Sequence, residues 1–92
     1  MKLKLNLLKP FSDIIGRKEL GFEFKGKTIK DLFQALVEQY PKLKEELYTE
    51  NDEITDYVSL FVNDKPLSVL NGVETKLKNG DELLIFVPIS GG

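Results

Sequence analysis

One stretch of helical periodicity limits the possible folds of this chain more than any other feature. Between residues 28 and 41, apolar side chains recur every three or four positions and form one stripe: Ile29, Leu32, Phe33, Leu36, Val37 and Tyr40. Thr28 is typical of a helix N-cap, Asp31 favours the positive end of the helix dipole, and Pro41 ends the helix. Since the rest of the chain carries mostly strand patterns, we predict a two-layer α+β domain with this helix covering one face of a sheet.

Alternating polarity predicts the strands that precede the helix. Residues 2–7 and 20–24 each alternate between apolar and polar side chains, which indicates two half-buried strands. The connection between them includes a short helical turn at residues 11–15. After the main helix, Leu43 and Leu47 predict a short second helical piece.

The second half of the chain returns to β patterns. We predict strands at residues 57–62, 67–70 and 82–87, with a turn at residues 63–66. The last strand is apolar on both faces, which fits a central strand lying parallel to the first one. The element order predicts a ubiquitin-like β-grasp domain over residues 1–88, with a mixed four- to five-stranded sheet and a flexible tail at residues 89–92. A small ferredoxin-like variant is the alternative.

Composition excludes several classes of function. The 92 residues contain no cysteine and no histidine, so the chain has no thiol nucleophile, imidazole base or Cys/His zinc site of its own. The formal net charge of −2 gives no reason to expect nucleic acid or an anionic membrane as a partner. No apolar run is typical of a signal peptide or a transmembrane helix, so we expect a cytoplasmic protein with no bound cofactor or metal.

The remaining candidate for chemistry is the segment Pro88-Ile89-Ser90-Gly91-Gly92. Two glycines without Cβ atoms can thread a narrow channel in another protein. A free α-carboxylate has a pKa of about 3.5, so at neutral pH it is an anion and a poor electrophile. Adenylation by ATP would activate the Gly92 carboxylate, which could then accept sulfur to give a thiocarboxylate or an amine to give an isopeptide bond.

Residues 62–64 and 71–92 resemble the MoaD family, the small subunits of molybdopterin synthase, which are relatives of the ThiS sulfur carriers. The most specific parts are Gly80-Asp81-Glu82, Ile85-Phe86, Pro88 and Gly91-Gly92. The chain departs from the family pattern at Val87, where a second proline is usual, and at Asp64, where glycine is usual. The likeness extends more weakly over the whole chain and implies the β-grasp fold.

The resemblance also implies a cycle with three partners. An adenylyltransferase similar to the ubiquitin-activating enzyme (MoeB- or ThiF-like) would adenylate Gly92 with ATP, and a persulfide donor would convert the adenylate to a thiocarboxylate. The large synthase subunit (MoaE-like) would then receive the tail, and the sulfur would pass to a pterin precursor of the molybdenum or tungsten cofactor. The chain would supply the reacting group without being a catalyst by itself.

The pleat of the last strand predicts a docking surface. If Leu83, Ile85 and Val87 face the helix, then Leu84 and Phe86, together with Phe61 of a neighbouring strand, lie on the uncovered face of the sheet. We expect these three residues to contact a partner together with Pro88, Ile89 and Ser90. In the opposite register, Phe61 and Phe86 would belong to the core.

Three other functions fit the same sequence. The chain could be a protein modifier, of the small archaeal or ubiquitin-related kind, joined to lysines through Gly92. It could also supply sulfur for tRNA or thiamine thiolation. The third alternative is a β-grasp binding module whose tail is inert.

Overall fold

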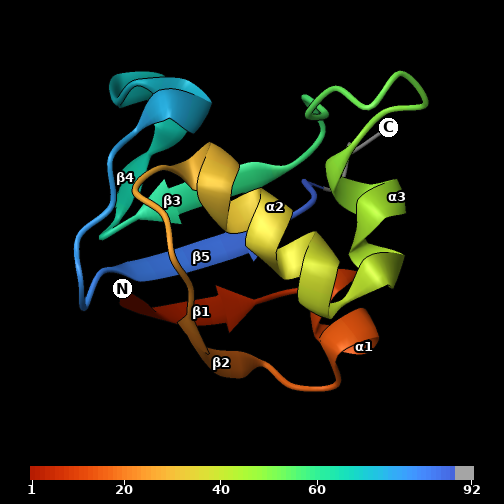
Figure 1. The fold of residues 1–92 in the computed structure, drawn as a ribbon, viewed down its shortest axis with the longest axis horizontal. Helices are drawn as coiled ribbons and strands as arrows, with labels where there is room; N and C mark the ends of the chain where they lie inside the picture. Colours follow the sequence, from red (N-terminus) through yellow and green to blue (C-terminus); the bar gives the residue numbers. More distant parts are fainter. Residues whose placement is uncertain (89–92) are drawn as a thin grey trace.

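A five-stranded mixed sheet carries the main helix on one face, as Figure 1 shows. The computed structural model describes residues 1–88, so residues 89–92 lie outside the described part. The strand order is β2-β1-β5-β3-β4, with these bounds: β1 Lys2–Leu7, β2 Glu19–Glu23, β3 Ser59–Val62, β4 Lys65–Pro66 and β5 Glu82–Phe86. β1 and β5 are parallel, and the other pairs are antiparallel. The predicted β-grasp fold and its central parallel pair are confirmed.

Three α-helices complete the fold: α1 at Phe11–Ile15, α2 at Ile29–Gln39 and α3 at Lys44–Leu47. Short 3₁₀ turns lie at Pro41–Leu43, Leu67–Val69 and Gly72–Glu74. The predicted turn at 11–15 and the helical piece around Leu43 and Leu47 are therefore confirmed. Among residues 1–88, only α2 spans the sheet, so the ferredoxin-like alternative, which needs two such helices, is wrong.

A capping box fixes the start of α2. The Thr28 hydroxyl accepts a hydrogen bond from the Asp31 N–H at 3.2 Å, and the Asp31 carboxylate accepts from the N–H groups of Lys27 (2.9 Å) and Thr28 (3.2 Å). These backbone donors stabilise the ionised carboxylate and hold the pKa of Asp31 below its ordinary value of 3.8. The predicted N-cap is thus present in its complete, reciprocal form.

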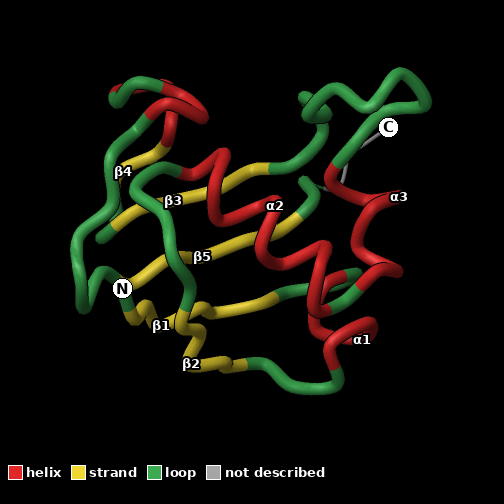
Figure 2. The backbone as a smooth tube through the Cα atoms, in the orientation of Figure 1, coloured by secondary structure: helices red, strands yellow, loops and turns green. Residues whose placement is uncertain are grey.

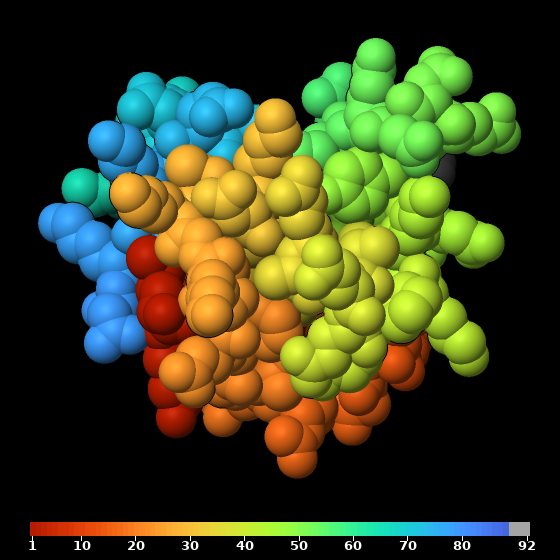
Figure 3. Space-filling view, in the orientation of Figure 1, coloured from red at the N-terminus to blue at the C-terminus, as the bar shows by residue number. Residues whose placement is uncertain are grey.

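The core lies between α2 and the sheet. Each side contributes fully buried side chains: Ile29, Leu32, Phe33 and Leu36 from the helix, and Leu3, Leu5, Leu7, Leu83 and Ile85 from the two central strands. Val37 and Tyr40, at the margins of the helical stripe, are half-buried. Figure 3 shows the outer surface of this side, where side chains of α2 and α3 cover the sheet.

Two strand predictions in the second half need correction. Residues 67–70 are not a strand, because β4 is only Lys65–Pro66 and is followed by the turn Leu67–Val69. The turn before β4 is shorter than predicted, since Asn63 and Asp64 both adopt positive φ angles (48° and 70°) and reverse the chain within two residues. Pro66 then offers no N–H to continue the ladder. Tyr57 also lies outside β3, with 80 % of its surface exposed.

Candidate functional site

The candidate site begins where β5 leaves the middle of the sheet. Figure 2 shows β5 between β1 and β3, and the Leu8 N–H donates to the Ile85 carbonyl at 3.1 Å near its end. The chain then passes through half-buried Val87 to exposed Pro88. The other predicted tail residues, Ile89, Ser90, Gly91 and Gly92, lie outside the described residues, so their roles stay predictions.

The two faces of β5 differ as the pleat predicts. Leu83 and Ile85 are buried against the helix, whereas Leu84 and Phe86 point to the uncovered face and are half-buried. Phe61 of β3 pairs directly with Leu84, so it lies on the same face. The Phe61 and Phe86 rings stack with their centroids 6.0 Å apart and their planes at 20°. We call Phe61, Leu84 and Phe86 the aromatic patch; its docking role is not shown by this geometry and stays a prediction.

A hollow of about 570 Å³ adjoins the aromatic patch. Phe61 and Leu84 form its apolar lining, Asn6 approaches from β1, and the exposed carboxylates Asp64 and Glu82 lie at its rim. Asn6 belongs here because it pairs with Leu84 across the parallel β1–β5 ladder. The patch therefore offers an apolar surface beside acidic groups, a combination that suits a partner with apolar and basic side chains.

Hydrogen bonds fix the acidic rim of this hollow. The Asn63 side-chain amide donates to the Asp81 carboxylate at 2.9 Å, and the Asn63 side-chain oxygen accepts from the Glu82 N–H at 3.0 Å. These bonds join the β3–β4 turn to the start of β5 and so fix the positions of Asp64 and Glu82, which both line the hollow. Asn6, Asp64 and Glu82 were not predicted from the sequence to line a site; the alternation in residues 2–7 was the signal that places Asn6 on this face.

Within residues 1–88, no group of three or more Asp, Glu, His or Cys side chains is placed to hold a metal ion. In the same part of the chain, no helix has both the length and the apolar character needed to cross a membrane. The described part of the candidate site thus consists of the end of β5 and the adjacent aromatic patch.

Comparison with known proteins identifies the group to which the chain belongs. The ThiS family profile matches residues 7–92. The chain belongs to the ThiS family. It is therefore a ubiquitin-like protein of the sulfur-carrier class, which agrees with the broader part of the sequence prediction.

Relatives of this ThiS-family protein carry different names. Small archaeal modifier protein 3 of Haloferax volcanii is 28 % identical, with all of both chains covered. The solution structure of small archaeal modifier protein 1 from Methanosarcina acetivorans is 29 % identical, covers 99 % of this chain and 96 % of that one, and has a TM-score of 0.85. A putative molybdopterin converting factor, subunit 1, from Pyrococcus furiosus is 26 % identical, covers 97 % and 99 %, and has a TM-score of 0.73. The narrower prediction of a molybdopterin synthase subunit has less support than the modifier alternative.

Proposed function

We propose that this ThiS-family protein is a ubiquitin-like modifier that is activated at the Gly92 carboxylate and joined to lysine side chains of other proteins. The observation that carries the proposal is its full-length similarity to a small archaeal modifier protein. The fold also supports the proposal, because the central strand β5 passes the aromatic patch and leads to exposed Pro88, which precedes Gly91-Gly92 in the sequence.

The chemistry proceeds in two balanced steps. The Gly92 carboxylate attacks the α-phosphorus of ATP on an adenylyltransferase similar to the ubiquitin-activating enzyme, and pyrophosphate leaves. The neutral ε-amine of a target lysine then attacks the acyl carbon, AMP leaves, and a base takes the surplus proton as the isopeptide bond forms. The chain contains no cysteine and no histidine, so we expect the partners to supply the acid and base groups for these steps.

The aromatic patch is the surface that we propose for docking on the activating enzyme. Its three apolar side chains are half-exposed: Phe61 on β3, and Leu84 and Phe86 on β5, the strand that precedes the tail. Burial of these side chains on a partner would remove their apolar surface from water. Pro88, Ile89 and Ser90 would contact the same partner as the tail enters its active site.

Sulfur transfer is the second candidate, and it uses the same activated carboxylate. A persulfide donor would convert the acyl-adenylate to a thiocarboxylate with release of AMP, and a large subunit of the MoaE kind would direct the sulfur to a pterin precursor. The similarity to the molybdopterin converting factor subunit of Pyrococcus furiosus favours this candidate. The two functions share activation and differ in the acceptor.

Mass spectrometry separates the candidates. The intact protein is isolated from its native cells, and the cell extract is searched for peptides that carry a Gly92 isopeptide bond on lysine. Such peptides support the modifier function, whereas a mass gain equal to the exchange of one oxygen for sulfur supports sulfur transfer. An unmodified intact mass with no conjugates, under conditions in which the adenylyltransferase and ATP are present, would contradict both. The intact mass also tests whether Gly92 ends the mature chain, as the proposal requires.

A further inference from the structure

Within residues 1–88, the edge strand β2 pairs on one side only, with β1, and its other side presents backbone groups that no described strand pairs with. On its inner side, Met1 and Phe24 exchange two backbone hydrogen bonds of 3.0 Å each, and the Leu7 N–H donates to the Lys18 carbonyl at 2.8 Å. Antiparallel pairing alternates from residue to residue. The backbone groups of Leu20 and Phe22 therefore face β1, while those of Glu19, Gly21 and Glu23 point to the open edge. An open edge of this kind is a template for one further strand.

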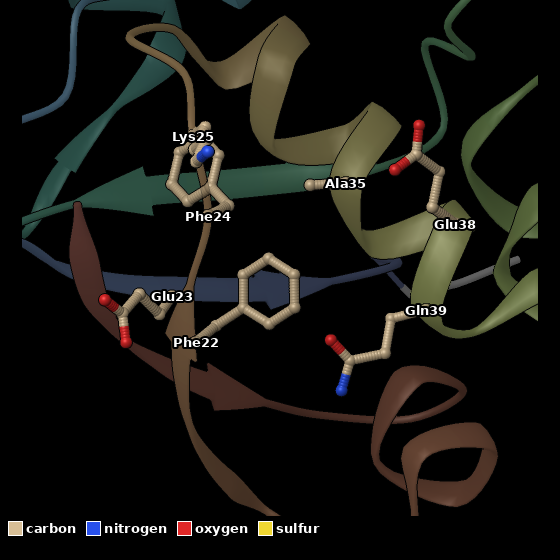
Figure 4. A pocket seen from close by; sticks show the side chains of 7 residues that line it. All are labelled: Phe22, Glu23, Phe24, Lys25, Ala35, Glu38 and Gln39. Atoms are coloured by element: carbon tan, nitrogen blue, oxygen red, sulfur yellow. The ribbon is translucent and has the colours of Figure 1, made fainter.

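A groove of about 440 Å³ lies directly beside this open edge, between β2 and α2. Figure 4 shows the Phe22 and Phe24 side chains extending toward the helix, with Ala35, Glu38 and Gln39 on the helix side of the groove. Only small parts of the two rings are exposed, 4 % and 7 %, so they form an apolar floor. A strand added to β2 would place every second side chain into this groove.

The charges along β2 restrict what that strand can be. The exposed side chains of Glu19 and Glu23 alternate with the buried side chains of Leu20 and Phe22, on either side of Gly21, which has no side chain, and Glu23 also borders the groove. If a second copy of the chain paired with β2 around a twofold axis at Gly21, Glu19 would lie directly opposite Glu23 of the other copy. Like charges opposite each other destabilise a strand pair, so the edge disfavours self-association.

A basic segment meets the opposite condition. Lys or Arg opposite Glu19 and Glu23 would form cross-strand ion pairs, on the side of the glutamates away from Lys2 and Lys4 of β1. Its alternate side chains must be apolar, because they face Phe22, Phe24 and Ala35. Glu38 at the helix rim adds a further negative charge near the groove, and Lys25 is the one basic group in its lining.

We propose that the β2–α2 groove binds an extended segment of a partner protein as a sixth strand, with apolar residues facing the groove and basic residues facing Glu19 and Glu23. β1 separates β2 from β5, so this surface is distinct from the aromatic patch. The inference does not depend on the proposed function. A protein that docks here leaves the central strand and the tail free for activation.

The test is an NMR titration with a short acetylated and amidated peptide that alternates isoleucine and lysine. We expect the amide signals of Glu19, Gly21 and Glu23 to shift and to gain protection from hydrogen exchange, while those of Phe61, Leu84 and Phe86 stay in place. A peptide that alternates isoleucine and glutamate is the charge control and should bind at least about tenfold more weakly.

Gly21 provides a matched pair of variants. Gly21→Pro removes an N–H that points to the open edge and donates to no group of β1, so we expect a folded protein that binds the lysine peptide at least about tenfold more weakly. Gly21→Ala keeps the N–H, and its Cβ would approach no atom closer than the Lys2 Cε at 3.7 Å, so binding should persist.

A charge-reversal variant tests the proposal even if the proline variant does not fold. The double variant Glu19→Lys, Glu23→Lys should lose the lysine peptide and gain the glutamate peptide. The proposal is overturned if the β2 amides do not respond to the lysine peptide at millimolar concentration. It is equally overturned if the shifts centre on the aromatic patch, or if both peptides bind wild-type protein equally.

Discussion

Gly26 lies between β2 and α2, where there is little room for a side chain. A Cβ atom at this position would lie 2.7 Å from the Asp31 Cβ and 2.8 Å from the Phe24 Cε2. Gly26→Ala therefore forces either the capping carboxylate or a core ring to move, and we expect a loss of about 1–3 kcal/mol in the free energy of unfolding. Urea denaturation measures this loss. Gly21→Ala is the control, and equal midpoints for the two variants would show that the close approach is not restrictive.

Asp31 gives the stability of the protein a dependence on pH. Its pKa in the folded protein lies below the ordinary value of 3.8, because the N–H groups of Lys27 and Thr28 bind the ionised form. A carboxyl group with a lowered folded pKa stabilises the fold above its unfolded pKa, and this contribution disappears as the pH falls through the folded pKa.

The Asp31→Asn variant tests this dependence. We expect it to be less stable than wild type above pH 3.8, with the difference shrinking as the pH falls below that value. Urea midpoints measured across this range give the comparison. Thr28→Ala, which removes the other half of the capping box, should cost about 1 kcal/mol, with part of that cost lost at low pH because the Thr28 hydroxyl also lowers the pKa of Asp31. A difference for Asp31→Asn that is independent of pH would contradict the assignment.

At the scale of the element, the alternation of β5 divides its side chains between the core and the uncovered face of the sheet. Leu83 and Ile85 belong to the core, whereas Phe86 reaches the opposite face and stacks on Phe61. Phe86→Thr replaces the ring with a β-branched side chain that also suits a strand, so we expect a stability loss of about 0.5–1.5 kcal/mol from the stacking, besides some lost burial.

If the aromatic patch docks on the activating enzyme, the same variant has a larger effect on activation. We expect the KM for the protein in pyrophosphate exchange with its adenylyltransferase to rise about tenfold or more, with a smaller change in kcat. Tyr57→Thr is the matched control, because this aromatic residue is 80 % exposed and lies outside the patch. Equal KM values for the two variants would exclude the patch from docking.

For the whole molecule, the sequence predicted the layers and the central strand pair but not the details of the sheet edge. The apolar stripe of α2 and the apolar residues on both faces of β5 were sufficient to predict the two layers and the central strand. A buried face requires apolar residues, so its position can be recognised in the sequence. β4 was misplaced because it has only two residues, and its position depends on the positive φ angles of Asn63 and Asp64. The hollow beside Phe61 was not predicted, since it forms only when the register brings Asn6, Leu84 and Phe61 together.

At the scale of the whole molecule, we propose that the domain and the tail have different roles. The helices and strands that the structure describes lie within residues 1–88, and the chemistry that we propose lies at Gly92. Deletion of Gly91-Gly92 should therefore leave the thermal midpoint unchanged and abolish adenylation, thiocarboxylate formation and conjugation together. Deletion of Gly92 alone is the sharper variant, because it keeps a C-terminal glycine carboxylate but shortens the reach by about 3.3 Å, enough to misplace the reacting carbon by far more than catalysis tolerates. If the shortened protein is adenylated at the wild-type rate, the position of Gly92 is not what the activating enzyme recognises; if the double deletion lowers the thermal midpoint, the tail contributes to the fold and is not only a reactive end.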